Sequence, residues 1–220
     1  MTTTQEQIEE QVENNLQKIR APLMEAMKNT PPSEVLNATS NRIRLNKMWR
    51  LGEEVSKIIS PNTACKNGCS HCCKQAVTIS EEEAKRIAEY RQSGYYKVAE
   101  NTPEAFIKKI EEQRDTYRGE ECPFLENNLC TIYSVRPIAC RFHFNLTDES
   151  SLCDTQTTNE VPNINFNQVH MLQIRALSPE EMSYGDIREY FGRGVRSKET
   201  KQKQEGTQNE TPTTAKELTE

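Results

Sequence analysis

The sequence lacks any long run of apolar residues. No stretch approaches the roughly 20 consecutive apolar residues that a membrane-spanning helix needs. The opening segment, Met1–Glu10, is polar and acidic and has no apolar run, so we expect no secretory signal. These absences predict a cytoplasmic protein that has no membrane partner.

An excess of positive charge is also missing. Lysine and arginine number 28 against 33 aspartate and glutamate residues, which gives a formal net charge of -5 and an isoelectric point near 5.5. A chain of this charge has no general attraction to nucleic acid, because that attraction needs a positive field. We therefore expect no nucleic-acid partner.

Apolar residues, at 34% of the chain, are too few to spread evenly over 220 residues and still form a core. The chain length favours one ordinary domain with extensions. We expect an N-terminal helical extension at residues 1–39, which also offers a surface to a protein partner, and a cysteine-cluster metal-binding domain at 40–192. Residues 193–220 are almost entirely polar and should be a disordered tail.

Strand patterns are weak throughout, and no internal repeat is present. Apolar residues at helical spacing predict a first helix over Gln5–Arg20, with Pro22 kinking or restarting it. Capping chemistry marks further helices. Their predicted starts are Ser40 (running to about Ile59), Ser80 with Glu83 (to about Tyr90), Thr102 before Pro103, and Ser178–Glu181 (ending near Gly192), with one extended segment at Ala76–Ile79.

Cysteine, in contrast, is plentiful. Thiols of a cytosolic protein are kept reduced, so eight cysteines there point to metal binding before disulfides. Buried free cysteines and regulatory disulfides are the lesser alternatives. The first group has four thiols within nine residues, and the second is more widely spread. The predicted metal ligands are Cys65, Cys69, Cys72 and Cys73, then Cys122, Cys130, Cys140 and Cys153.

The first group suits a metal in either of two conformations. A helix would place its cysteines on one face, whereas a loop around Gly68 would fold them about an ion. The neighbours Cys72 and Cys73 point in different directions, so one of them should face a second site or lie behind the first. Zinc and iron–sulfur clusters both take four such ligands, and the count leaves open both the metal and the number of sites.

The spacing resembles a known family, the zinc- or iron-chelating proteins named for a CxxCxxCC cluster. The resemblance runs from about Cys65 to Cys153. Its first motif matches at Cys69, Cys72 and Cys73. Its second matches the stretches CPFL from Cys122, CTIY from Cys130, and RPIACR from Arg136 to Arg141. Three residues rather than two separate Cys65 from Cys69, which departs from the family pattern.

The resemblance implies metal chelation, without a settled activity, and gives roles to neighbouring residues. Tyr133 and Arg136 would pack beside the site, and Arg136 or Arg141 would donate hydrogen bonds to the thiolates. Histidines close to the cysteines are alternative ligands, because neutral imidazole binds zinc. They are His71 and His143, with His170 as a more distant candidate.

An enzyme is the competing interpretation. The spacing Cys65-x3-Cys69-x2-Cys72 is the one with which radical S-adenosylmethionine enzymes hold a four-iron cluster, and flagellin lysine methylases also resemble the cysteine-cluster family. Radical enzymes of that type build a partial barrel of repeated strand–helix units, which the helical patterns and eight glycines of this chain do not predict. We therefore expect a mainly α fold: a small irregular helical domain organised around a cysteine metal site, with zinc or an iron–sulfur cluster as its cofactor.

Overall fold

The computed structural model describes residues 4–66, 68–100, 102–154 and 183–192. Helices predominate among them, which confirms the mainly α fold. The chain divides into two compact units, each built from two separate stretches of sequence. The first unit draws on Met1–Cys72 and Ile138–Ser178, and the second on Cys73–Pro137 and Pro179–Glu220.

The predicted domain boundaries, at residues 39 and 192, stay a prediction. The expected tail at 193–220 lies outside the described residues. Within the described part of the chain, no helix is both long and apolar enough to cross a membrane.

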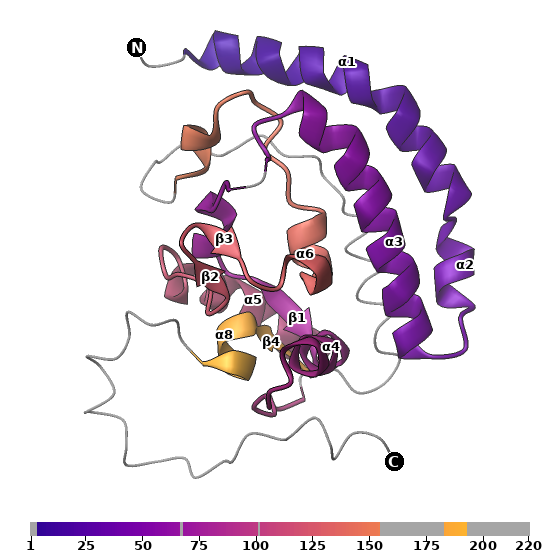
Figure 1. The fold of residues 1–220 in the computed structure, drawn as a ribbon, viewed down its shortest axis with the longest axis vertical. Helices are drawn as coiled ribbons and strands as arrows, with labels where there is room; N and C mark the ends of the chain where they lie inside the picture. The colour runs from indigo at the N-terminus through magenta and orange to yellow at the C-terminus, as the bar shows by residue number, and fades with distance from the viewer. Residues whose placement is uncertain (1–3, 67, 101, 155–182, 193–220) are drawn as a thin grey trace. The chain divides into compact units, whose positions relative to one another are not determined.

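Two long helices frame the first unit. Helix α1 spans Gln5–Asn29 and α3 spans Asn41–Ile59, and the short helix α2, Pro32–Leu36, lies in the connection between them. Helices α1 and α3 lie side by side (Figure 1). Ser40 caps α3 as predicted, since its hydroxyl accepts a hydrogen bond from the backbone N–H of Ile43 at 3.3 Å.

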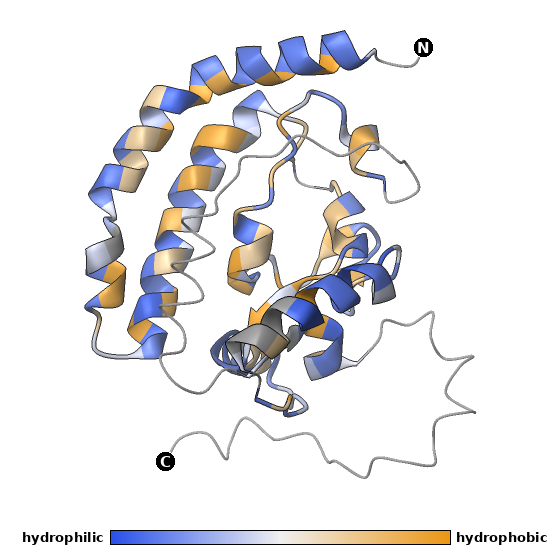
Figure 2. Cartoon of the chain, turned by 180° about the vertical axis from the view of Figure 1, so that it is seen from behind, coloured by the Kyte–Doolittle hydropathy of each residue, from blue (hydrophilic) through white to orange (hydrophobic). Residues whose placement is uncertain are grey.

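The core of the first unit lies between these helices. Figure 2 shows hydrophobic residues along the sides of α1 and α3 that face each other and hydrophilic residues on the outer side of α1. Burying these side chains is the main favourable contribution to the packing of the two helices. The buried apolar residues are Ile8, Ile19 and Ala26 of α1, and Leu45, Met48, Trp49, Leu51, Val55 and Ile59 of α3.

Helix α1 is longer than the sequence indicated. It continues past Arg20 to Asn29, with Pro22 inside it. A proline inside a helix removes one backbone hydrogen bond and crowds the preceding turn. Ile19 and Ala26, on either side of Pro22, are both buried, and their packing offsets that loss.

Helix α6, Ile138–Arg141, packs on α3 at Gly52. A Cβ at Gly52 would lie only 2.9 Å from the Cβ of Arg141, so glycine permits the close approach. The buried Arg141 guanidinium pairs with Glu53 and lies 4.9 Å from the ring centre of Trp49. These contacts hold α6, and Cys140 within it, against α3. Two 3-10 turns, Ser60–Asn62 and Ser150–Cys153, complete the described elements of the first unit.

Helices α4, Glu81–Arg91, and α5, Pro103–Thr116, are the longer helices of the second unit. The predicted capping box at the start of α4 is confirmed. The Ser80 hydroxyl accepts from the Glu83 N–H at 3.3 Å, and the Glu83 carboxylate accepts from the Ser80 N–H at 3.0 Å. Thr102 caps α5 in the same way, through the N–H of Ala105.

The described strands of the second unit are two or three residues long, in keeping with the weak strand signal. Strand β1, Thr78–Ser80, pairs antiparallel with β4, Tyr184–Asp186, and Thr78 lies opposite Asp186. Strands β2, Leu125–Glu126, and β3, Leu129–Cys130, form a hairpin. Its two-residue turn, Asn127 and Asn128, has positive φ angles of 52° and 61°, a conformation that asparagine tolerates well.

Helix α8, Ile187–Phe191, follows β4 directly. The Asp186 carboxylate caps it by accepting from the Arg188 N–H at 2.9 Å, and Gly192, at a φ of 78°, follows the last turn where the sequence predicted a stop. The predicted helix start at Ser178–Glu181 lies outside the described residues. The remaining 3-10 turns are His71–Lys74 and Tyr133–Val135.

Two isoleucines of α3 test this packing. Ile59 is fully buried, whereas Ile43 is 42% exposed. We expect Ile59→Ala to lower the free energy of unfolding by about 2–5 kcal/mol, because it leaves a cavity. The matched control, Ile43→Ala, should cost less than about 1 kcal/mol. Urea denaturation followed by circular dichroism measures both, and equal losses would contradict the described core.

Candidate metal centre

Cys65 and Cys69 lie outside any helix, and Cys72 and Cys73 lie in the 3-10 turn His71–Lys74. No single helix carries the group, so the helical interpretation was wrong and the loop around Gly68 is present. The N–H of Cys69 donates to the carbonyl of Lys66 at 3.1 Å, which closes a turn. Gly68 occupies this turn at a φ of +88°, where other residues are strained.

In the first unit, Cys65 is joined to the segment that follows α6. The N–H of Asn145 donates to the Cys65 sulfur at 3.1 Å. The adjacent residue, Ala64, donates its N–H to the carbonyl of Thr147 at 2.7 Å. Two backbone contacts therefore fasten the first cysteine group to a stretch about 80 positions later in the sequence.

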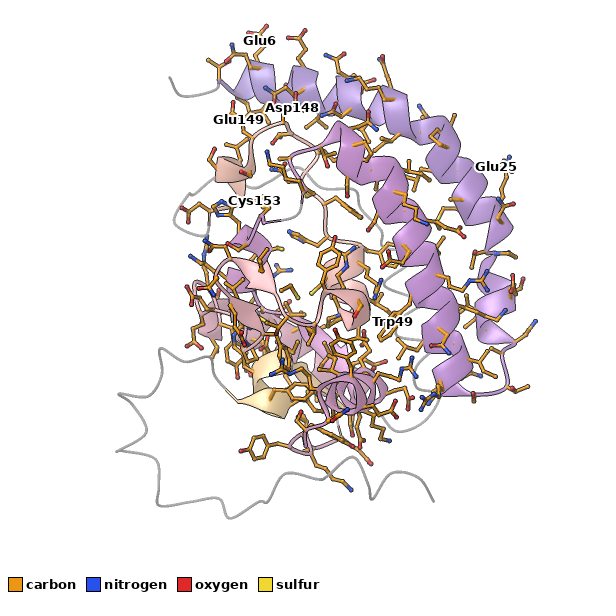
Figure 3. All side chains as sticks on the ribbon, in the orientation of Figure 1. Glu6, Glu25, Trp49, Asp148, Glu149 and Cys153 are labelled. Carbon is orange, nitrogen blue, oxygen red and sulfur yellow. The ribbon has the colours of Figure 1, made fainter. Side chains whose placement is uncertain are left out.

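Asn145 also organises the loop that leads to Cys153. It is 1% exposed, and its side-chain oxygen accepts from the N–H and the hydroxyl of Thr147 at 2.9 and 2.8 Å. Its amide nitrogen donates to the carbonyl of Glu149 at 2.9 Å, and its side chain hydrogen-bonds the Cys153 thiol. Figure 3 shows Glu149 and Cys153 on this loop. One buried asparagine thus touches two of the eight cysteines.

A second asparagine ties the same loop to α1. The side-chain nitrogen of Asn15, which is buried within α1, donates to the carbonyl of Leu146 at 2.9 Å and to the carboxylate of Asp148 at 3.0 Å. In Figure 3, Asp148 lies beside the N-terminal half of α1. The long helix therefore supports the loop that carries Cys153.

Two thiols of the first unit, Cys65 and Cys153, have raised pKa values because of burial and of neighbouring cysteines. Burial raises the pKa of Cys65, and the charges of Cys72 and Cys69 raise it further. Burial, followed by the charge of Cys65, raises the pKa of Cys153 to about 12, and Cys69 and Cys72 add to the rise. Cys69 and Cys72 therefore lie within electrostatic range of both Cys65 and Cys153, although these cysteines come from both groups.

In the second unit, backbone contacts join the two cysteine groups. The N–H of Cys122 donates to the carbonyl of Cys73 at 2.7 Å. The β2–β3 hairpin sets Cys130 opposite Leu125, whose own N–H bonds the Cys122 carbonyl at 3.0 Å. This unit therefore holds Cys73, Cys122 and Cys130 on connected segments.

Burial raises the pKa of Cys122 to about 12, and the charge of Cys130 adds to the rise. The N–H of Phe124 and the positive charge of Arg188 act in the opposite direction. The thiol is buried and uncharged at neutral pH, with one cation close enough to affect it.

Cys140 and the arginines of its motif occupy other settings. Cys140 is half-buried on α6. The guanidinium of Arg141 pairs with the Glu53 carboxylate, a partner that the family resemblance does not imply. In the second unit, the guanidinium carbon of Arg136 lies 4.2 Å from the ring centre of Tyr133, which is half exposed. These two residues thus contact each other, and their place beside a metal stays a prediction.

The histidines differ in their setting. His71 begins the 3-10 turn His71–Lys74 and is half-buried. Burial lowers the pKa of His143, so this imidazole is neutral at neutral pH, which is the form that binds metals. His170 lies outside the described residues.

Convergence of the ligands is incomplete. Within residues 4–66, 68–100, 102–154 and 183–192, no three side chains of cysteine, histidine, aspartate or glutamate come together closely enough to hold an ion as they stand. All eight cysteines are free thiols. Thiol chemistry fits zinc or iron, and the thiols that lie near one another in each unit are a suitable donor set.

The enzyme interpretation is not favoured. A radical-enzyme barrel needs parallel strands alternating with helices. In the part of the chain that the structure describes, the strands form two antiparallel pairs and no such repeat.

Two residues that contact the cysteine segments escaped the sequence analysis. Asn145 and Arg188 stand in no motif, and a single sequence gives an ordinary asparagine or arginine no signal. Only the fold, which places them beside cysteines distant in sequence, identifies them.

Comparison with known families matches residues 64–165 to the CxxCxxCC family, which is described as a putative zinc- or iron-chelating domain. Neither the curated proteins nor the solved structures contain a match. The matched span covers all eight cysteines, confirms the expected family, and agrees with the expected cofactor, zinc or an iron–sulfur cluster. Residues 64–165 of this chain, slightly less than half of its length, are therefore similar to the zinc- or iron-chelating domain of the CxxCxxCC family.

Proposed function

We propose that this protein binds zinc or an iron–sulfur cluster through thiolates contributed by both cysteine groups. The observation that carries the proposal is that Cys65 and Cys153 of the first unit both hydrogen-bond Asn145 and that Cys69 and Cys72 lie close enough to raise the pKa of both. Neighbouring thiolates repel one another, so ionisation of one thiol makes ionisation of the next less favourable. A cation bound between them attracts each thiolate and offsets this repulsion.

The ligands are proposed for each unit by itself. Cys65, Cys69, Cys72 and Cys153 form a set of four in the first unit, the number that a zinc ion or a cluster takes, and Cys140 lies on α6 of the same unit. Cys73, Cys122 and Cys130 belong to the second unit. The division between Cys72 and Cys73 supports the hypothesis that these neighbours serve different sites.

The proposed role of the metal is to join segments. The loop after α6 and the first cysteine group are held by a few hydrogen bonds, and a metal would add ligand bonds between them. Eight reduced thiols suit a reducing compartment, and we place the protein in the cytoplasm. A protein partner for α1 also remains a proposal.

The metal itself is tested by anaerobic purification, elemental analysis and a visible spectrum. We expect bound iron with broad absorption in the blue, or zinc without colour. A protein that carries neither metal, and takes up neither when metal-free protein is supplied with zinc or with iron and sulfide, would overturn the proposal.

Two neighbouring positions supply the variant and its control. Cys153→Ser removes a buried thiol from the set of four and should lower bound metal, whereas Ser151→Ala alters an exposed residue of the same 3-10 turn and should leave it unchanged. Equal metal content in the two variants would exclude Cys153 as a ligand.

Removal of the metal should loosen the fold. A metal present at about 100 times its Kd stabilises the folded state by about 2.7 kcal/mol. For a chain of this size that corresponds to a fall in Tm of about 5–10 °C on chelation. Thermal scans of the loaded and chelator-treated protein by circular dichroism measure this shift. An unchanged Tm and helical signal would contradict a structural role for the metal.

Metal uptake should also release protons. The raised pKa values of Cys65, Cys122 and Cys153 keep these thiols protonated at neutral pH, so each one that becomes a thiolate ligand gives up a proton. Zinc added to the metal-free protein in weak buffer should acidify the solution, and the apparent affinity should rise with pH.

The same shifts give a pH dependence for the metal-free protein. A thiol whose pKa is raised by folding stabilises the folded state fully below the unfolded value, about 8.5. That contribution is lost as the pH rises toward about 12, the folded value for Cys122 and Cys153. Urea unfolding between pH 7 and 11 should show the loss, and a smaller one in Cys153→Ser. Stability that is flat over this range in both proteins would contradict the assignment.

A further inference from the structure

The charged side chain of Arg188, in α8, is buried. The residue is 2% exposed, and the side chains of Arg188 and Asp186 are both 0% exposed. One terminal nitrogen of the guanidinium donates to the two carboxylate oxygens of Asp186 at 2.9 and 3.1 Å. Burying such a pair costs free energy unless further hydrogen bonds satisfy the remaining donors.

The second terminal nitrogen donates to three backbone carbonyls, whereas the Nε is buried without a hydrogen-bond partner in the described part of the chain. They belong to Glu120 at 2.5 Å, Gln75 at 3.3 Å and Cys73 at 3.4 Å. Cys73 is the last residue of the first cysteine group and Gln75 lies two residues after it, whereas Glu120 lies two residues before Cys122. One guanidinium group thus contacts the backbone of both cysteine segments.

These two segments already run beside each other. The N–H of Cys122 donates to the Cys73 carbonyl at 2.7 Å, and the N–H of Gly119 donates to the Lys74 carbonyl at 2.8 Å. Arg188 lies where the segments meet, and its bonds to Cys73 and Glu120 fix their separation. A lysine could not do this, because its single nitrogen lacks the planar fork.

The position of the guanidinium is itself fixed. The Asp186 carboxylate accepts from the N–H of Val77 at 2.7 Å and from the N–H of Arg188 at 2.9 Å. Val77 in turn accepts from the N–H of Ile187 at 2.9 Å, next to the β1–β4 pairing. The guanidinium of Arg188 is therefore held in place by the β1–β4 sheet and by the start of α8.

We propose that Arg188, with Asp186 behind it, is a positioning residue that sets Cys73 and Cys122 for binding the same metal. The inference rests on the proposed metal-binding function. Arg188 lies outside residues 64–165, the span of the family match, so nothing in that match assigns it a role.

A purely structural contribution to the second unit is the competing explanation, and a matched variant separates the two. Ile87 of α4 is fully buried in the same unit and is not among the residues that bond the cysteine segments. Ile87→Ala should destabilise the unit through a cavity. If Arg188 acts only through stability, Ile87→Ala should weaken metal binding as much as a variant of Arg188 that is equally destabilised.

The experiment uses the metal-free full chain with cobalt(II) as the probe. Titration reports affinity, and the absorption from thiolate to cobalt reports how many sulfurs bind and in what geometry. We expect Arg188→Met to weaken cobalt binding to the second unit about 10–100-fold and to reduce the thiolate absorption. Arg188→Lys, which keeps the charge, should lie between it and the wild type, and Ile87→Ala should keep the wild-type spectrum.

Double variants locate the effect. In a Cys122→Ser background, Arg188→Met should cause little further loss, because the ligand it positions is gone. In a Cys153→Ser background, which alters the first unit, it should cause the same loss as in the wild type. Urea unfolding of each variant without metal supplies the stability against which affinities are compared, and Arg188→Lys serves if Arg188→Met does not fold.

The outcomes separate this inference from the proposed function. Wild-type protein that binds no cobalt, zinc or iron would overturn the function and the inference together. Wild-type binding with unchanged affinity and spectrum in Arg188→Lys and Arg188→Met would overturn the inference alone. So would a loss in Ile87→Ala as large as in an Arg188 variant of equal stability, or equal losses from Arg188→Met in the Cys122→Ser and Cys153→Ser backgrounds.

Discussion

Sulfur atoms gathered from distant parts of a chain repel one another as soon as they ionise, and burial makes each ionisation harder still. In the first unit this constraint acts on Cys65 and Cys153, whose pKa values are raised by burial and then by neighbouring thiols. The protein holds them near each other without disulfides, by hydrogen bonds from Asn145. This arrangement keeps the two thiols close while they stay protonated, so their charges do not repel one another.

Both units meet this constraint in a similar way, through a buried polar residue from outside the cysteine motifs. Asn145 contacts two cysteines of the first unit, and Arg188 spans the two cysteine segments of the second. Arg141, which the motif suggested for this purpose, has its charge paired with Glu53 and stacked on Trp49. The polar residues that contact the cysteine segments thus lie outside the cysteine motifs, and the fold brings them there.

Much of the fold was predictable where it depends on local chemistry. The caps at Ser40, Ser80 and Thr102 are confirmed, because a hydroxyl that accepts from an N–H three residues later acts within one turn. The length of α1 was not predictable, since packing on both sides of Pro22 outweighs the proline.

The short strands and the site were harder to predict, for a related reason. Thr78 pairs with Asp186 across more than 100 residues, and a three-residue strand has too little pattern to reveal it. The sequence identified the cysteines and their chemistry. Which of them share a unit, and that the chain divides between Cys72 and Cys73, depends on contacts between distant segments.

The order of the chain has a consequence for biosynthesis. All eight cysteines precede Asp186 and Arg188, so a ribosome completes every thiol before it makes the residues that join the second unit. Contacts of such sequence separation form late and slowly. A nascent chain therefore exposes its sulfurs for a time without their supporting residues. The two cysteine segments of the second unit are therefore joined through Arg188 only after residue 188 has been translated.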